Sequence, residues 1–270
     1  MPYKSYDNLI DITTVVLSQD NARTLGKCLK SVVVFSKELI VIDYGGFSSG
    51  EAAAKISKNY THNFHHMSNI GWFHLQKRAL DLCSHNWVFF LCADEMVSPS
   101  LEEEIREFFK SSKSEAFQGF RSPRKLYIGN DFLRWGGNYP DHQLRLFRNG
   151  SGKFRGVGLE DGFEIWNPSS EKYSADDPSL IYTSKQSLHY SPYLDITEMR
   201  EVYAGLAVTQ ESPYDNEILA TMLAILKFIE LYILKLGFLD LTYGYDFAEI
   251  EMNFILQRFQ KAKESAKFND

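Results

Sequence analysis

The chain contains few of the features that mark several common classes of protein. Only three of its 270 residues are cysteines, Cys28, Cys83 and Cys92, and no two of them stand in a Cys-x-x-Cys or other metal-ligand spacing. This excludes a disulfide framework and a thiolate zinc site, and it favours a reducing compartment in which the thiols pack as small apolar groups. The formal net charge is −6, which argues against extensive binding of nucleic acid.

The chain also lacks an uninterrupted apolar stretch long enough to cross a bilayer. The longest candidate, residues 218–238, contains Lys227, Glu230 and Lys235, and charges at such depth in a membrane are costly. We therefore expect either a helix packed against neighbouring helices, including those of a second copy in a homodimer, or a helix lying in the membrane interface. Residues 1–12 show no apolar run of signal-peptide length, so we expect a cytoplasmic protein whose membrane contact is at most peripheral.

An alternation of strand and helix signals is present over the first half of the chain. Apolar, β-rich runs at 12–17, 38–43 and 87–92 alternate with amphipathic patterns at about 21–30, 51–58, 75–83 and 98–110. This alternation predicts an α/β fold with a mostly parallel sheet covered by helices on both faces, and a ligand crevice beyond the carboxyl ends of the strands. Shorter strand-like pieces follow from residue 117 to about 190, and the remainder reads as helical.

Carboxylates are expected at the ends of these strands. The run WVFFLC ends shortly before Asp94 and Glu95, and the second strand ends at Asp43. A hard divalent cation takes oxygen ligands, so carboxylates that reach the crevice suit an enzyme that binds a metal ion and a diphosphate. From the residues alone, an equal alternative is that Asp94 or Glu95 only caps the helix that begins near Ser98.

Seven segments, in chain order, carry a resemblance to a known family. The ADE turn is similar to an LDADE motif, and YPDHQLRLF is close to a Tyr-Pro-Asp-Trp-Gln-Leu-Arg-Leu-Phe stretch. The other five similar segments are TTVVLSQDNARTLGKCLKSV, ELIVIDYGG, HLQKRAL, LHYSPYLDITE and FIELYILKLGFLD. Together they resemble family 2 glycosyltransferases, in particular the branch of lipopolysaccharide-core β-1,4-glucosyltransferases. The similarity spans nearly the whole chain; YPDHQLRLF is its most specific part and ADE its least.

The resemblance implies a fold and a reaction. The fold would be GT-A, the Rossmann-like architecture of nucleotide-diphospho-sugar transferases, over residues 1–190, with a donor half of about 1–115 and an acceptor half of about 116–190. Residues 191–270 would form a helical C-terminal region. The expected reaction is inverting transfer of a hexose from a UDP-linked sugar to a glycan or lipid-linked glycan, assisted by Mg²⁺ or Mn²⁺, in the synthesis of cell-envelope polysaccharide or lipopolysaccharide core.

Carried over residue by residue, the resemblance also implies a donor site. The donor-binding residues would be Ser18, Asp20, Asp43, Lys77 and Asp94. Asp94 would hold the metal ion, and His189 would be a second contact to the metal or the diphosphate. Without the family, His189 reads more readily as a partly buried histidine that is hydrogen-bonded to the backbone.

The catalytic base is expected in the segment RGVGLEDGFEI. An inverting transfer needs one carboxylate to take the proton of the attacking hydroxyl, and glycines before the acids let the loop approach a sugar closely. The core-glucosyltransferase branch usually carries His-Glu here, which selects Glu160, whereas family 2 enzymes at large often carry Glu-Asp, which selects Asp161. The alternative is a loop acid that is only solvated.

A basic segment is expected on the acceptor side. Eight Lys and Arg residues lie between positions 121 and 155 of a chain that is acidic as a whole, and arginine forks suit phosphate and carboxylate oxygens. The candidate acceptor or phosphate contacts are Trp135, Tyr139, Asp141, Gln143 and Arg145. The alternative is an ordinary solvated basic surface with the aromatic rings in the core.

Three departures from the family pattern leave other functions open. The family's Asp-Ser-Gly-Ser-Thr-Asp is here DYGGFS, the first Asp of Asp-Ala-Asp is Cys92, and the His of His-Glu is Leu159. Sulfur is a soft ligand, so Cys92 cannot replace a carboxylate for a hard cation. A catalytically impaired relative that binds sugar nucleotide or acts as an interaction protein is therefore the alternative. A nucleotidyltransferase is disfavoured because no Gly-rich phosphate loop follows the first strand.

Overall fold

The computed structural model describes residues 8–67, 71–155, 162–193, 195–209 and 216–269. The chain divides into two compact units. Unit 1 comprises residues 1–124 and 142–190, and unit 2 comprises residues 125–141 and 191–270. The second segment of unit 1 ends at residue 190, and residues 125–141 group with the C-terminal helices.

Four parallel strands form the centre of unit 1. They are β1 (Ile10–Ser18), β2 (Ser36–Asp43), β3 (Phe64–His66) and β4 (Trp87–Cys92), in the order β3-β2-β1-β4. In the register, Ser18 lies beside Asp43, Asp43 lies beside His66, and Cys92 pairs with Leu17. The strands therefore end flush at one edge, and the predicted strand-end residues are neighbours there.

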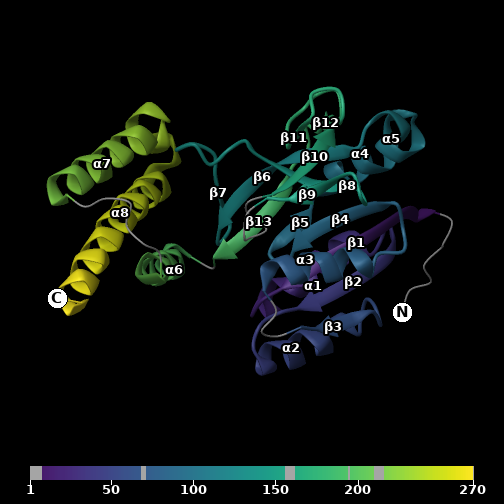
Figure 1. The fold of residues 1–270 in the computed structure, drawn as a ribbon, viewed down its shortest axis with the longest axis horizontal. Coiled ribbons are helices and arrows are strands. Elements are labelled where there is room, and N and C mark those ends of the chain that lie inside the picture. The colour runs from purple at the N-terminus through teal and green to yellow at the C-terminus, as the bar shows by residue number, and fades with distance from the viewer. Residues whose placement is uncertain (1–7, 68–70, 156–161, 194, 210–215, 270) are drawn as a thin grey trace. The chain divides into compact units, whose positions relative to one another are not determined.

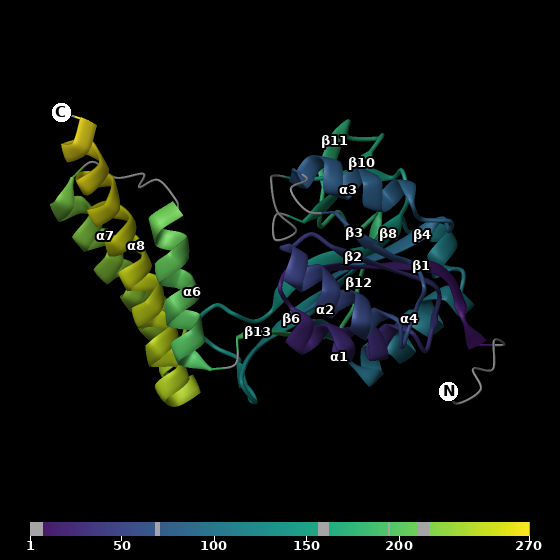
Figure 2. The same ribbon diagram turned by 90° about the horizontal axis from the view of Figure 1, so that it is seen from below.

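Both faces of this sheet are covered, as the alternation predicts. On one face, alternate strand residues such as Val16 and Leu91 pack against α1 (Ala22–Val32), α2 (Phe47–Ser57) and α4 (Pro99–Lys110). On the other face, Leu17 and Phe90 pack against α3 (Trp72–Asp81) and against a small sheet of β9 (Gly152–Phe154), β10 (Phe163–Asn167) and β11 (Lys172–Ser174). Figure 2 shows α3 on the opposite side of the strands from α1, α2 and α4.

The main sheet continues beyond β4 with mixed directions. Its order is β4-β8-β6-β13-β5, with β12 beside β6, and β8 and β5 join their neighbours antiparallel. These strands are β5 (Glu95–Val97), β6 (Gly119–Ile128), β8 (Asp141–Arg148), β12 (Ile181–Thr183) and β13 (Leu188–Tyr193), and the short helix α5 (Lys113–Ala116) precedes β6. Figure 1 shows the arrangement. The predicted fold class, an α/β fold with a mostly parallel sheet between helices and a helical C-terminal region, is confirmed.

Unit 2 is built from a hairpin and helices. Strand β7 (Asp131–Leu133) pairs with the end of β6, and the helices are α6 (Ile196–Thr209), α7 (Glu217–Ile229) and α8 (Leu241–Asn269). Between α7 and α8 the chain forms a π-helical turn, η3 (Glu230–Leu234), and a 3₁₀ turn, η4 (Gly237–Asp240). Its core contains Leu133, Met199, Leu231 and Phe247. None of the helices in the part of the chain that the structure describes has the length and apolar character needed to cross a membrane.

Candidate functional site

The carboxyl ends of β1, β2 and β4 bring the predicted donor-site acids together. Asp20 follows β1 by two residues and has a positive φ of 57°, Asp43 ends β2, and Asp94 lies in the turn after β4. Tyr44 lies among them: burial raises the pKa of its phenol, and the nearby Cys92 and all three acids raise this pKa further. The sheet therefore gathers three carboxylates around one partly buried aromatic ring.

Asp43 is held on both of its oxygens. The Ser49 hydroxyl donates to Oδ1 at 2.9 Å, and Nδ1 of His66 lies 3.0 Å from Oδ2. The same Ser49 oxygen accepts a hydrogen bond from the Asp20 backbone N–H at 2.9 Å, which ties the ends of β1 and β2 together. Gly50 makes room for the ring, because a Cβ there would lie 2.5 Å from Nδ1 of His66. Sequence reasoning missed Ser49 and His66: the pairing of β2 with β3 reveals His66, and the start of α2 brings Ser49 to Asp43.

Three buried polar atoms beside these acids have no hydrogen-bond partner among the described residues. They are Oγ of Ser18, Nε1 of Trp72 and Nε2 of Gln76. Trp72 and Gln76 are one turn apart on α3, the ring of Trp72 lies edge-on to Tyr44 at 6.0 Å, and the Tyr44 N–H donates to the Ser18 carbonyl. A buried polar group without a partner costs about 1–3 kcal/mol, so this cluster suits a ligand that supplies hydrogen-bonding oxygens.

Lys77, by contrast, is exposed. On α3 it follows Gln76, whose side chain is buried along with Leu75 and Ala79. The helix therefore turns Trp72 and Gln76 toward the sheet, and a contact of Lys77 with the donor would have to come from the outer face of α3.

The turn after β4 is fixed by a buried ion pair that the sequence did not reveal. Glu95 is fully buried, and Nη2 of Arg145, itself 1% exposed, lies 3.0 Å from Oε1 of Glu95. Nη1 of Arg124 lies 3.4 Å from the same oxygen, and the Arg124 guanidinium stacks over the ring of Tyr190 at 4.0 Å. Glu95 also accepts a hydrogen bond from the Cys92 backbone N–H at 3.0 Å. The carboxylate thus closes the turn that carries Asp94.

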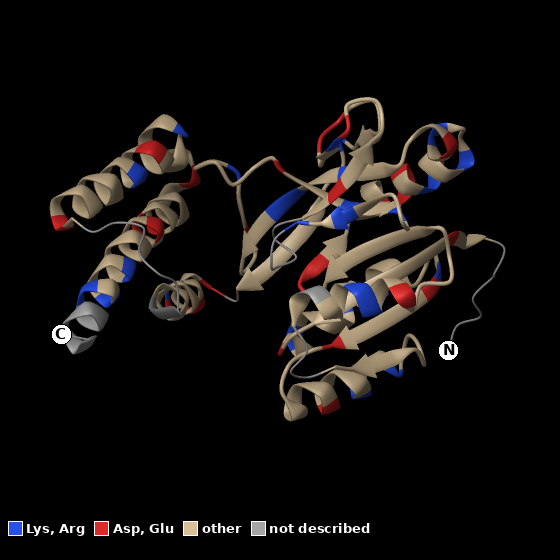
Figure 3. Cartoon of the chain, viewed as in Figure 1, with Lys and Arg blue, Asp and Glu red and all other residues tan. Residues whose placement is uncertain are grey.

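This ion pair corrects two expectations. Glu95 does not face the crevice, because β5 pairs with β13 and turns its side chain into the interior. The predicted phosphate or acceptor contact of Arg145 does not agree with its position either, since its buried guanidinium is directed at Glu95. The basic segment is also divided between elements, and Figure 3 shows its blue residues on several strands.

The other predicted acceptor contacts fall in two units. Gln143 is in unit 1, whereas Trp135, Tyr139 and Asp141 are in unit 2. In unit 2 the backbone N–H of Trp135 donates to the Asp240 carboxylate at 2.7 Å, and the Tyr139 ring packs edge-on against the Phe132 ring, with centroids 5.4 Å apart. The loop that contains them is therefore shaped in part by its packing within unit 2.

The metal site has two predicted protein ligands, Asp94 and His189. His189 is half-buried on β13, opposite Met96 of the short strand that follows Asp94. Across the described ranges, no group of three or more His, Cys, Asp or Glu residues is arranged to hold a metal ion. Magnesium is commonly held by one or two carboxylates together with substrate phosphates. An ion held by Asp94 and His189 would therefore take most of its ligands from the donor diphosphate and water.

The candidate bases, Glu160 and Asp161, lie outside the described residues. The flanking strands are described: β9 pairs antiparallel with β10, Phe154 lies opposite Phe163, and the Arg155 N–H donates to the Gly162 carbonyl at 2.9 Å. The two acids thus belong to the connection of a β-hairpin whose base packs on the main sheet.

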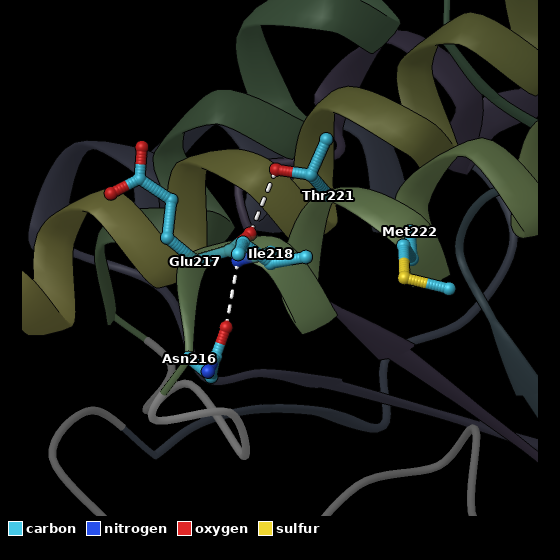
Figure 4. A pocket seen from close by; sticks show the side chains of 5 residues that line it. All are labelled: Asn216, Glu217, Ile218, Thr221 and Met222. Carbon is cyan, nitrogen blue, oxygen red and sulfur yellow. Dashed lines mark hydrogen bonds between the residues drawn. The ribbon is translucent and has the colours of Figure 1, made fainter.

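A separate hollow lies at the start of α7. Asn216 caps the helix by accepting from the N–H groups of Ile218 and Leu219, and Glu217, Thr221 and Met222 complete the lining (Figure 4). It is an open surface feature of unit 2, and none of the strand-end carboxylates lines it.

Comparisons with known proteins agree with the family resemblance. No family model matches the chain. The lipopolysaccharide core biosynthesis glycosyltransferase LpsC of Rhizobium meliloti (strain 1021) is 26% identical over 154 residues, which are 54% of this chain and 53% of that protein. The chain is thus matched to about half the length of this curated relative. The predicted resemblance to lipopolysaccharide-core glycosyltransferases is confirmed at this level.

Solved structures add distant likenesses. A fragment of TarS from S. aureus, residues 1–349, is 13% identical with a TM-score of 0.42, covering 97% of this chain and 92% of that one. A second TarS structure is 15% identical with a TM-score of 0.43, covering 95% and 55%. Likenesses of this size do not identify a family.

Proposed function

We propose that the chain is an inverting glycosyltransferase that moves a hexose from a UDP-linked sugar to a glycan or lipid-linked glycan of the cell envelope, such as lipopolysaccharide core. The similarity to LpsC supports the reaction class. The observation that carries the proposal is the gathering of Asp20, Asp43 and Asp94 around Tyr44 at the carboxyl edge of the parallel strands. In open α/β sheets this edge is where ligands bind.

The donor nucleotide would occupy this edge. The three polar atoms without partners, on Ser18, Trp72 and Gln76, offer hydrogen bonds to the carbonyl, hydroxyl and phosphate oxygens of the nucleotide. Asp43, already oriented by its two neighbours, would accept a hydrogen bond from the nucleoside, with Asp20 beside it and Lys77 toward the diphosphate. Tyr44 stands where the family has a serine, and its ring would contact the nucleoside.

The transfer itself needs a base and a stabilised leaving group. The acceptor oxygen forms a bond to the anomeric carbon as the bond to the diphosphate breaks, and the hydroxyl proton passes to a carboxylate. Glu160 is the proposed base on the grounds of its sequence position, with Asp161 as the alternative. Trp135, Tyr139, Asp141 and Gln143 remain the proposed acceptor contacts.

A divalent cation, Mg²⁺ or Mn²⁺, is the proposed cofactor. Asp94 and His189 would hold it together with the donor phosphates, and a bound cation would neutralise charge on the departing diphosphate. Asp94 is well suited to this, because the Glu95 carboxylate braces its turn from within.

We further propose that residues 218–238 contact the cytoplasmic surface of a membrane. Ile218, Met222, Ile225 and Ile229 recur at helical spacing and are exposed on α7, whereas Ala220 and Ala224 are buried. Such a stripe suits an interfacial helix. Flotation with liposomes tests the membrane contact, and Met222→Glu should abolish binding. If wild type does not bind liposomes and forms a dimer that Met222→Glu disrupts, the stripe is a homodimer interface instead.

The reaction class is tested by the base variant. With radiolabelled UDP-hexoses and a core-oligosaccharide acceptor, wild type should transfer label to the acceptor. Glu160→Gln should reduce turnover by about 10²-fold or more. Glu171→Gln, which replaces an exposed acid on another loop, should leave turnover unchanged. Unchanged turnover in Glu160→Gln and reduced turnover in Asp161→Asn would move the base to Asp161. Donor binding without transfer under either metal would favour the catalytically impaired relative.

A further inference from the structure

The small sheet β9-β10-β11 has two unlike faces. Phe163 and Ile165 of β10 are buried against the main sheet. Glu164 and Trp166 of the same strand lie on the other face, because successive side chains of a strand point to opposite sides. Trp166 pairs across the strands with Tyr173 of β11. The outer face of this small sheet therefore presents aromatic rings to solvent; Figure 1 shows where its strands lie.

Trp166 and Tyr173 form an exposed aromatic pair. Each is 41% exposed, and their ring centroids are 5.0 Å apart at an interplanar angle of 56°. Of the four large apolar side chains that stand out as exposed among the described residues of unit 1, these two are adjacent, whereas Val34 and Phe47 lie on other elements. Each ring leaves about two fifths of its surface in water and so forgoes part of the burial that drives aromatic residues into cores. A ligand that stacks on the pair would cover this surface.

The polar groups of this face are also available. Within the described residues, no hydrogen bond engages the Trp166 indole N–H or the Tyr173 hydroxyl, and Lys153 forms no ion pair. The Lys153 ammonium lies 4.0 Å from the centroid of the Tyr173 ring. Glu164, the one acid of the face, is matched by Arg155 at 3.7 Å. The face therefore carries a net positive charge in a chain whose net charge is −6.

We propose that this face, defined by Lys153, Trp166 and Tyr173, binds a glycan whose pyranose ring bears an acidic group. The apolar C–H face of a pyranose stacks on aromatic rings, its hydroxyls accept from an indole N–H and exchange hydrogen bonds with a phenol, and Lys153 pairs with a carboxylate or phosphate on the sugar. Gly152 permits the close pairing that positions Lys153, because a Cβ there would overlap the Glu164 carbonyl oxygen.

The inference rests on the proposed function only in taking this glycan to be the acceptor. The face includes residues of β9 and β10, the two strands between which Glu160 and Asp161 stand in the sequence. Binding of a glycan to the face needs neither a donor nor a metal ion, and it can be measured separately from transfer.

The experiment titrates the full chain with trigalacturonate and with its methyl-esterified, uncharged form, following tryptophan fluorescence and saturation-transfer NMR. Wild type should bind trigalacturonate more tightly than the ester. Trp166→Ala and Tyr173→Ala should each weaken binding at least about fivefold, the size of one lost ring contact. Val34→Ala, which truncates a similarly exposed apolar side chain elsewhere in unit 1, should bind as wild type. Lys153→Gln should remove the preference for the charged form.

Binding of trigalacturonate by Trp166→Ala with the wild-type affinity, or no binding by wild type, would overturn the inference. Equal binding of the charged and uncharged forms by wild type would overturn the requirement for an acidic group. UDP-hexose binding is measured on the same samples. Failure of wild type to bind UDP-hexose would count against the proposed function alone. Binding of UDP-hexose by Trp166→Ala as by wild type shows that the variant is folded.

Discussion

The buried carboxylate of Glu95 gives a quantitative prediction. Replacing it with glutamine keeps the length of the side chain but removes its charge, so the buried guanidinium groups of Arg145 and Arg124 lose their ion pairs with this carboxylate. Removing one partner of a buried ion pair costs about 3–5 kcal/mol, because the remaining charge is uncompensated. The glutamine amide oxygen still accepts a hydrogen bond, so we expect a loss of about 3–4 kcal/mol in the free energy of unfolding.

Urea unfolding followed by circular dichroism measures this loss, provided that the slope of the transition is unchanged. Asp11→Asn is the control, since it breaks an ion pair with Lys37 whose partners are both exposed, and it should cost less than about 1 kcal/mol. Arg145→Met should be less harmful in the Glu95→Gln background than in wild type, because the ion pair with Glu95 that it breaks is already absent there. A loss below about 1 kcal/mol for Glu95→Gln would refute the buried pair.

Three further predictions concern the strands and their site. Burial raises the pKa of Glu38, but hydroxyl and amide donors more than offset this and hold the pKa below its ordinary value. The stabilisation by the carboxylate is therefore present above the unfolded pKa of about 4.3 and lost as pH falls through the lower folded pKa. Between about pH 5 and 3, the urea midpoint of Glu38→Gln should fall less steeply than that of wild type. Trp72→Phe removes an indole N–H that has no partner among the described residues. Calorimetry should find UDP-hexose affinity reduced about tenfold, the loss of one hydrogen bond, with thermal stability unchanged. Gly50→Ala forces His66 to move and should cost about 1–3 kcal/mol in thermal unfolding, whereas Gly46→Ala meets no atom within 4 Å and should be nearly neutral.

The donor side of the fold could be predicted because its signals are local. The run from Trp87 to Cys92 is a strand with the predicted bounds, and Ser98 caps the next helix, as its sequence suggests. Strand-end positions such as Asp43 follow from the alternation of elements alone, since parallel strands end at one edge. Helix α2 begins at Phe47, four residues before the predicted start, because Gly46 adopts the extended N-cap conformation within what reads as a turn.

The ion pair of Glu95 could not be predicted, since its signals are not local. β5 is three residues long, too short to show a period of two, and its partner β13 lies more than 90 residues away. Arg145 is 50 residues from Glu95, and nothing in the basic segment distinguishes an arginine that enters the core from one that stays in solvent. The contact of His66 with Asp43 was hidden for the same reason, because β3 has only three residues.

Calorimetric titration of the full chain with UDP-, GDP-, dTDP- and CMP-sugars, each with and without Mn²⁺, shows whether a donor site lies at the ends of the parallel strands. We expect metal-dependent binding of a UDP-sugar that is lost in Asp94→Ala and kept in Asp81→Ala, a control on an exposed acid at the end of α3. Binding of no sugar nucleotide by wild type, or equal binding by Asp94→Ala, would contradict a donor site at the ends of the parallel strands.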